Sequence, residues 1–263
     1  MLNQIKIEAL SLNKLEVFPI TCLPTIKEGD DLAMLIFQAA ENQGTPIQNG
    51  DVIVVTHVIV SRAEGTVVDL ETISPSEFAK TIAETTSKDP RLVELIFRES
   101  KSIVRMKNKK LITETKQGLV CANSGIDQSN VPGKNIVALL PEDADRSAAR
   151  IRYKIRKFTK KDVAVVVSDT HGRPLRQGEI NIAIGASGFE PIRDRRGEKD
   201  LFEYTIRLKR TAIADELASA AELVIGQTNE GVPVAIIRGY YYKKSETAKA
   251  TQLIRPVEED LFL

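Results

Sequence analysis

The chain has 263 residues, 42% of them hydrophobic, and is long enough to bury a sizeable core as one large domain or two modest ones. Its 37 lysines and arginines nearly balance 36 aspartates and glutamates, so the net charge of +1 excludes a global field that would recruit nucleic acid or an anionic membrane. The two cysteines, Cys22 and Cys121, lack zinc-site spacing and are too few for a disulfide framework, which favours a cytoplasmic location.

The start of the chain lacks the pattern of a targeting segment. From Met1 to Phe18, asparagine, lysine and glutamate interrupt the apolar residues, unlike the apolar core of a signal peptide, and no apolar run approaches the length of a membrane span. We therefore expect a chain that is mature from Met1, with neither a membrane nor a nucleic acid as partner.

The first half of the chain predicts one long helix, one buried strand and two short helices. The helix begins at Asp30 or Asp31 and ends near residues 42–44, with apolar residues at helical spacing along one face. The nearly continuous β-branched run from Asp51 to Val60 predicts a strand buried on both faces. A capping box formed by Ser74 and Glu77 predicts two helical segments that end at about residue 100.

The second half predicts a hairpin around residues 107–110, followed by a strand over 119–122. Helical spacing predicts a basic amphipathic helix within 143–158 and a further helix over 213–224, and apolar runs predict strands over 163–167 and 234–237. The alternation lacks the strict βαβ rhythm of a doubly wound sheet, and neither a repeat nor a linker divides the chain. We expect an α+β fold in a single unit over residues 1–263.

Polar side chains gather where the predicted strands end. Asp127 lies in a turn-forming segment after the strand over 119–122, and Asp169 and Thr170 follow the strand over 163–167. Carboxylate and hydroxyl oxygens suit a hard cation such as Mg²⁺ or Mn²⁺, and the two segments can share one site. The loop over 226–233 adds Gln227 and exposed backbone N–H groups, which together suit a nucleoside triphosphate.

The motifs of common enzyme classes are absent from the sequence, including the phosphate loop, the dinucleotide fingerprint and the zinc-protease helix. The residues alone therefore indicate a metal-dependent enzyme that acts on an anionic substrate. Alternative interpretations stay open, because loop aspartates often close Asx turns, and His57 and His171 fit a core and a turn position. The basic stretches over 146–161 and 193–200 fit solvent-exposed surfaces, and Tyr240 to Tyr242 have no assigned role.

Five collinear motifs resemble the coenzyme F420-0:L-glutamate ligase family and span nearly the whole chain. They are LPTIKEGDDL (23–32), VSRAEG (60–65), ETKQGLVCANSGIDQSNV (114–131), SDTHGRPLRQG with AIGASG (168–188) and DELASAAELVIGQTNEGVPVAIIRG (215–239). The resemblance implies two intertwined α+β subdomains with mixed or antiparallel sheets, distinct from a Rossmann or P-loop fold, in a homodimer. It also implies a ligase that uses GTP to activate the lactyl carboxylate of F420-0 as an acyl phosphate, which L-glutamate then attacks. Addition of a further γ-linked glutamate is compatible with it.

The resemblance assigns roles to individual residues. Asp127 and Asp169 match the ligands of one divalent cation, Mn²⁺ or Mg²⁺, through which they act in catalysis. Thr170 and Gln227 match ligands of a second divalent cation. The resemblance also allows a monovalent K⁺ ion as a cofactor. The positions that match GTP contacts are Leu23, Pro24, Thr25, Ile26, His57, Val58, Arg62, Asn130, Ile225, Gly226, Gln227, Thr228, Asn229, Glu230, Gly231 and Val232.

Two features lie outside the family pattern. His57 and Arg62 stand where that pattern has a small hydroxyl residue and a lysine, and Glu203 and Tyr204 stand where it has glycine and arginine. Arg173 and Arg176 are our own candidates for guiding an anionic substrate. Two other functions stay open: a ligase of the same fold that acts on a different acid, and a non-catalytic nucleotide-binding module.

Overall fold

A computed structural model describes residues 14–260. The stretch from Met1 to Phe18, which we expect not to be a cleaved leader, lies largely outside the described residues. The helices of the described chain are α1 (Leu32–Asn42), α2 (His57–Glu64), α3 (Glu77–Thr86), α4 (Pro90–Arg98), α5 (Ala144–Thr159) and α6 (Ile213–Ile225). The strands are β1 (Glu16–Ile20), β2 (Val52–Thr56), β3 (Val67–Asp69), β4 (Ser100–Lys107), β5 (Lys110–Thr115), β6 (Val120–Ala122), β7 (Ile136–Ala138), β8 (Ala164–Gly172), β9 (Glu179–Phe189), β10 (Ile192–Asp194), β11 (Arg210–Ala212), β12 (Val234–Arg238) and β13 (Lys244–Ser245).

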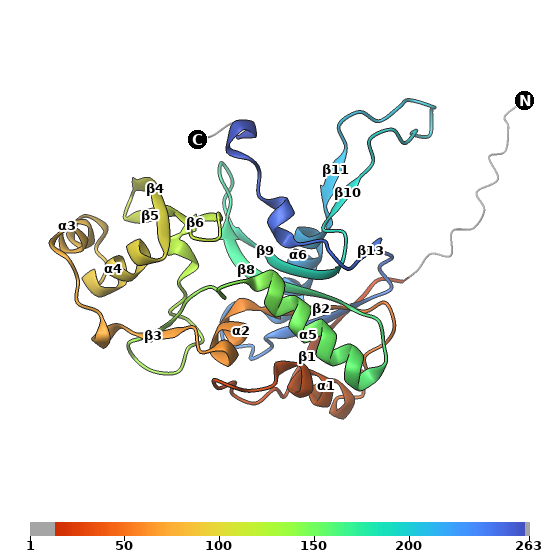
Figure 1. The fold of residues 1–263 in the computed structure, drawn as a ribbon, viewed down its shortest axis with the longest axis horizontal. Helices are drawn as coiled ribbons and strands as arrows, with labels where there is room; N and C mark the ends of the chain where they lie inside the picture. Colours follow the sequence, from red (N-terminus) through yellow and green to blue (C-terminus); the bar gives the residue numbers. More distant parts are fainter. Residues whose placement is uncertain (1–13, 261–263) are drawn as a thin grey trace, which may run out of the picture.

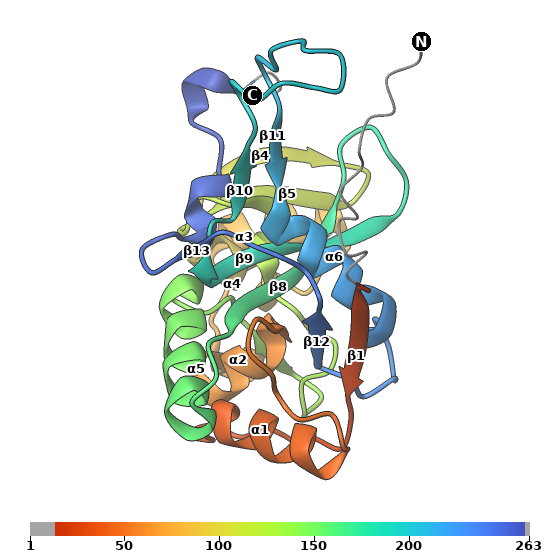
Figure 2. The same ribbon diagram turned by 90° about the vertical axis from the view of Figure 1, so that its right-hand side faces the viewer.

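A six-stranded sheet in the order β1-β12-β2-β8-β9-β13 forms the centre of the molecule (Figures 1 and 2). Strands β2 and β8 run parallel and the other neighbours run antiparallel. Alternate side chains of β2 enter two cores: Ile53 and Val55 join the cluster with α1 and α5, whereas Val52 and Val54 join the cluster with α6. The central strand is thus buried on both faces, as its β-branched run predicts.

A smaller part of the chain lies beside the central sheet, over β3 to β7 with α3 and α4 (Figure 1). Its sheets are the pair β3-β7 and the three strands β4-β5-β6, and its own apolar cluster includes Leu70, Leu95, Ile96 and Leu111. The combination of helices with mixed and antiparallel sheets confirms the α+β prediction. The intertwining of two subdomains stays a prediction.

Several element predictions are confirmed. Asp31 caps α1 by accepting a hydrogen bond from the Met34 amide, the hairpin joins β4 to β5, and the basic helix, the later helix and strand β12 all occur where expected. The capping box is wrong by two residues, because Ser76 and not Ser74 caps α3 through the Ala79 amide. Both of the helices predicted after this cap are present, as α3 and α4.

The strand predicted over residues 51–60 is wrong in its second half. Strand β2 ends at Thr56 and α2 begins at His57, because Ile59 and Val60 pack into the cluster with α1 and α5 and Gly65 ends the helix with a φ of 73°. The β-branched run permits a helix here because tertiary packing outweighs local propensity. The N-terminus of α2 consequently lies directly at the end of β2.

The strand predicted to end at Val167 extends to Gly172. Its polar continuation pairs with β9, and a register shift between Val167 and Ser168 marks the change from apolar to polar side chains. Asp169 and Thr170 therefore lie on a strand and not in the loop that we expected after it.

The hairpin of β10 and β11 carries a long loop that projects away from the body of the molecule (Figures 1 and 2). Within residues 14–260, no helix combines the length and the apolar character needed to cross a membrane.

Candidate functional site

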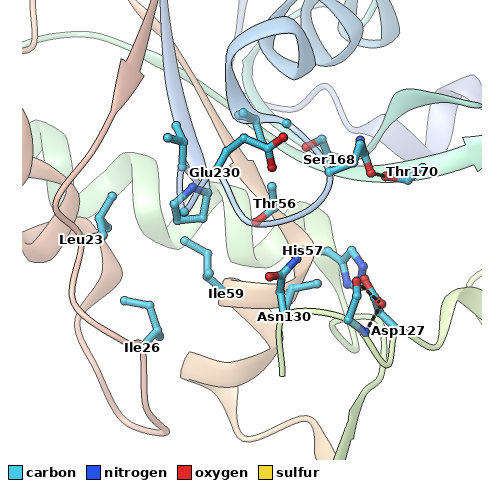
Figure 3. Close-up of a pocket in the computed structure, with 18 of the residues that line it drawn as sticks. Leu23, Ile26, Thr56, His57, Ile59, Asp127, Asn130, Ser168, Thr170 and Glu230 are labelled. Carbon is cyan, nitrogen blue, oxygen red and sulfur yellow. Dashed lines mark hydrogen bonds between the residues drawn. The ribbon is translucent and has the colours of Figure 1, made fainter. Parts of the chain in front are cut away.

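A cavity of about 250 Å³ opens at the end of the central sheet, and its walls come from five separate segments. These are the stretch after β1, the junction of β2 and α2, the loop between β6 and β7, the strands β8 and β9, and the loop between α6 and β12. Figure 3 shows Leu23 and Ile26 on one side of the pocket and His57, Asp127 and Thr170 on the other. The pocket therefore has an apolar side and a polar side.

The parallel pair of strands brings His57 beside Asp169. Thr56 of β2 pairs with Ser168 of β8, and the next residues place the His57 Nε2 3.2 Å from the Asp169 Oδ1, with the two side chains 3% and 11% exposed. Burial lowers the pKa of the imidazole, but the charge and hydrogen bond of Asp169 and the charge of Asp127 outweigh it, so the pKa lies above its ordinary value. His57 is buried, as its interpretation as a core residue predicts, and it also lines the pocket.

Asp127 reaches the pocket from a loop with an unusual backbone. Asn123 and Ser124 have φ angles of 54° and 55°, and the Ser124 hydroxyl lies 2.7 Å from that of Thr113. Asp127 then closes an Asx turn, because its Oδ1 accepts hydrogen bonds from the backbone N–H and the hydroxyl of Ser129, each at 2.7 Å. The Asx interpretation is correct, and the same side chain still lines the pocket.

Thr170 and Gln227 meet although 57 residues separate them in the chain. The Thr170 Oγ1 lies 2.8 Å from the Gln227 Oε1 and 2.9 Å from the Asn181 Oδ1. Among the described residues, no three His, Cys, Asp or Glu side chains form a metal-binding group. A cation in this pocket would depend on hydroxyl and amide oxygens as well as carboxylates, and such donors suit a hard ion.

Helix α2 presents its N-terminus to the pocket. Val58 and Ile59 of its first turn line the cavity, and no side chain caps the helix at Thr56. Arg62, one turn further on, donates a 2.6 Å hydrogen bond from its Nη2 to the Ile26 carbonyl, and its Nη1 lies 3.4 Å from the Asn130 carbonyl. The arginine thus joins three walls of the pocket.

The loop after α6 bends at Gly226, whose φ is 75°. A Cβ at this glycine would lie 2.3 Å from the Glu230 Cδ, and the Glu230 carboxylate accepts a 2.8 Å hydrogen bond from the Thr228 amide. Backbone hydrogen bonds, its own and that of Thr228, hold the pKa of Glu230 below its ordinary value. Glu230 therefore shapes the loop from within.

The pocket gathers nearly every residue that the sequence assigns to it. Asn229 is absent from the lining. Arg173 and Arg176 lie in the turn between β8 and β9, also outside the lining, and the Arg173 guanidinium donates to the Gly178 and Gln177 carbonyls at 3.2 and 2.6 Å. Their role toward a substrate stays a prediction.

Sequence reasoning missed several residues that line the pocket: Thr56, Ile59, Ser129, Ser168, Asn181 and Pro233. Most of these are direct neighbours or near neighbours of predicted residues in the chain. Asn181 is the exception, because it reaches the site only through the pairing of β9 with Thr170 on β8. No local pattern marks it.

Comparison with known proteins gives consistent matches. A family model described as F420-0:Gamma-glutamyl ligase matches residues 21–239. Proteins named coenzyme F420:L-glutamate ligase are 45% identical in Methanopyrus kandleri over 95% of this chain and 98% of that protein, and 46% identical in Methanothermobacter thermautotrophicus over 91% and 95%. The protein of that name from Methanocaldococcus jannaschii is 45% identical over 95% of this chain and 97% of its own.

Proposed function

The chain belongs to the F420-0:Gamma-glutamyl ligase family, and we propose that it uses GTP to join L-glutamate to the lactyl carboxylate of coenzyme F420-0. The single observation that carries the proposal is the convergence of the five family motifs on one pocket. Segments that begin at Leu23 and end at Val232 meet there from across the chain.

A carboxylate is a poor electrophile, so amide formation needs a leaving group. In the proposed reaction the γ-phosphoryl group of GTP moves to a carboxylate oxygen of F420-0, and GDP departs. The α-amine of L-glutamate then attacks the acyl carbon, loses a proton and expels inorganic phosphate, which leaves the amide. Addition of a second, γ-linked glutamate repeats the sequence on the new carboxylate. Positioning and charge stabilisation supply most of the catalysis in such a phosphoryl transfer.

The two sides of the pocket suit the two ends of GTP. Leu23 and Ile26 offer an apolar surface for the base, opposite the polar side chains of His57 and Thr170 (Figure 3). The uncapped N-terminus of α2 presents backbone N–H groups and a partial positive charge, which favour phosphate oxygens. The loop that begins at Gly226 adds further backbone N–H groups.

The oxygen donors fit two divalent cations. Asp127 and Asp169 would hold one ion, and Thr170 and Gln227 would hold the other. Mg²⁺ or Mn²⁺ at these places supplies positive charge that offsets the crowded phosphate and carboxylate oxygens. His57 holds the Asp169 carboxylate at Oδ1, and Ser129 holds the Asp127 carboxylate, so both ligands are oriented by contacts within the chain.

A homodimer completes the proposal. The loop between β10 and β11 exposes Leu201, Phe202 and Leu208 at 88%, 89% and 89%. Large apolar side chains gathered on a projecting loop are typical of a surface that a partner covers. We propose that a second copy of the chain covers this loop.

The test of the ligase activity is a mass-spectrometric assay of the purified chain with F420-0, L-glutamate, GTP and Mn²⁺, with GDP release measured in parallel. We expect one glutamyl mass increment for each GDP released, loss of both in Asp169→Ala, and retention of both in Glu41→Ala, a control on the exposed face of α1. GTP binding without any increment would move the substrate to a different acid. GDP release that Asp169→Ala leaves intact would overturn the metal assignment.

A further inference from the structure

Glu222, in the last turn of α6, joins three segments behind the pocket. Its Oε1 accepts a 2.5 Å hydrogen bond from the Gln227 Nε2, and its Oε2 accepts a 2.8 Å hydrogen bond from the Asn181 backbone N–H. The neighbouring Ser219 hydroxyl donates to the Asn181 carbonyl at 2.7 Å. Helix α6 therefore holds both β9 and the loop that carries Gln227, while Glu222 itself is not among the residues that line the pocket.

The contact with Glu222 fixes the orientation of the Gln227 amide. A carboxylate only accepts hydrogen bonds, so the Gln227 NH₂ group must face Glu222. The Gln227 Oε1 is consequently turned to the opposite side, where it lies 2.8 Å from the Thr170 Oγ1. Which atom Gln227 offers to Thr170 is thus decided by the contact of its amide with Glu222, a residue outside the pocket.

Asn181 takes the same orientation for a related reason. Its Oδ1 lies 2.9 Å from the Thr170 Oγ1 and 3.4 Å from the Gln227 Nε2, so the Gln227 NH₂ group favours an oxygen at that position. Asn181 is only 2% exposed, which leaves its amide few other partners.

Three oxygen atoms therefore converge, and too few hydrogen atoms lie between them to form a hydrogen bond at each contact. The Thr170 hydroxyl has one hydrogen, yet it lies at hydrogen-bond distance from both the Asn181 Oδ1 and the Gln227 Oε1. One of these two carbonyl oxygens must face a lone pair of the hydroxyl. A hard cation bound by oxygen lone pairs relieves that conflict without any rearrangement of the side chains.

We propose that Glu222 is a positioning residue that keeps the oxygens of Gln227 and Asn181 turned toward Thr170, and that the Asn181 Oδ1 is a third ligand of the cation held there. The inference rests on the proposed function, because the cation is the second of the two ions proposed above. It extends that function by naming a ligand on β9 and a residue on α6 that sets the identity of the donor atoms.

The substitution Glu222→Gln tests the positioning role directly. It is nearly isosteric, and it reverses the direction of the hydrogen bond between positions 222 and 227. The Asn181 N–H still needs an acceptor, so the new amide turns its oxygen to Asn181 and its NH₂ group to Gln227. Gln227 must then flip and present its own NH₂ group to Thr170. We expect the variant to bind the second Mn²⁺ about 10- to 100-fold more weakly, the usual effect of removing a residue that orients a metal ligand.

The measurement is a Mn²⁺ titration of the full chain with stoichiometric GTP and no acid substrate, followed by electron paramagnetic resonance and corrected by the same titration of GTP alone. The double variant Glu222→Gln with Gln227→Glu provides a rescue. The new amide at position 222 donates to one oxygen of the new carboxylate at position 227, and the second oxygen of that carboxylate faces Thr170. Glu216→Gln, an exposed position on the same helix, is the matched control.

We expect two bound ions in the wild-type chain and the control, a weakened second ion in Glu222→Gln, and its recovery in the double variant. Equal binding in Glu222→Gln and the wild type would overturn the positioning role while leaving the ligase function intact. Failure of the double variant to recover the ion would assign the loss to structural damage and reject the role. A wild-type chain that holds fewer than two ions yet releases GDP in the ligase assay would reject the second site alone.

Discussion

Asp127 and Asp169 give the polar side of the pocket its negative charge, but their surroundings differ. Asp169 contacts the buried imidazole of His57, whereas the Oδ1 of Asp127 is occupied by Ser129. Both carboxylates act on the same histidine and raise its pKa against the effect of burial. The N-terminus of α2, whose first residue is His57, carries the opposite partial charge. Cations and phosphates are thus each favoured within one cavity.

The two cysteines differ in their exposure to solvent, and their reactivity toward a thiol reagent can measure that difference. Burial raises the pKa of the Cys121 thiol to about 12, with a further contribution from the charge of Asp169, while Cys22 is exposed. Because the thiolate is the nucleophile, we expect iodoacetamide at pH 8 to modify one thiol per chain rapidly. Peptide mass spectrometry should find the label on Cys22, with Cys121 labelled only after unfolding. Rapid labelling of Cys121 in Cys22→Ser would contradict the burial of the Cys121 thiol.

At the scale of the elements, the β8-β9 pair shows what local pattern can and cannot predict. The apolar run to Val167 predicts the buried half of β8, because three valines in succession fit a strand between two cores. The polar half from Ser168 to Gly172 is a strand only because β9 pairs with it, and that pairing leaves no local signal. Asn181 is missed for the same reason.

The predicted site residues depended on a different kind of information. Collinear motifs mark five of the segments that form the pocket, so most of its lining follows from the resemblance even where an element was wrong, as at His57. Neither composition nor spacing brings Gln227 next to Thr170, because 57 residues separate them. Only the packing of α6 against β8 and β9 places them together.

Gly185 on β9 lies at a close approach of the sheet to α5, and a substitution there tests the packing of these two elements. A Cβ at this position would lie 2.2 Å from the Ala144 carbonyl oxygen, a backbone atom in the first turn of α5. Gly185→Ala should therefore displace the helix or the strand and lower the free energy of unfolding by about 3 kcal/mol. Urea unfolding measures the loss. Gly172→Ala on β8 is the control, because nothing lies within 4 Å of a Cβ there. Equal stability of the two variants would refute the close contact.

At the scale of the whole molecule, the pocket lies where the two parts of the chain meet. The central sheet supplies Asp169 and Thr170, and helix α2 supplies His57, whereas the smaller part supplies Asp127 and Asn130 through the loop after β6. A ligand that contacts both carboxylates therefore joins two regions with separate apolar clusters. Their relative position sets the geometry of the site.

The projecting loop between β10 and β11 exposes large apolar side chains. Its exposed Leu201 and Phe202 would cost free energy in water, and a second copy that buries them would recover it. We expect sedimentation velocity to show a dimer for the wild-type chain and a shift toward monomer for Leu201→Ser with Phe202→Ser. Leu175→Ser is the matched control, since Leu175 is 92% exposed on the turn between β8 and β9 and lies outside the proposed interface. A dimer that survives the double substitution would place the interface on another surface, and a monomeric wild type would refute the dimer.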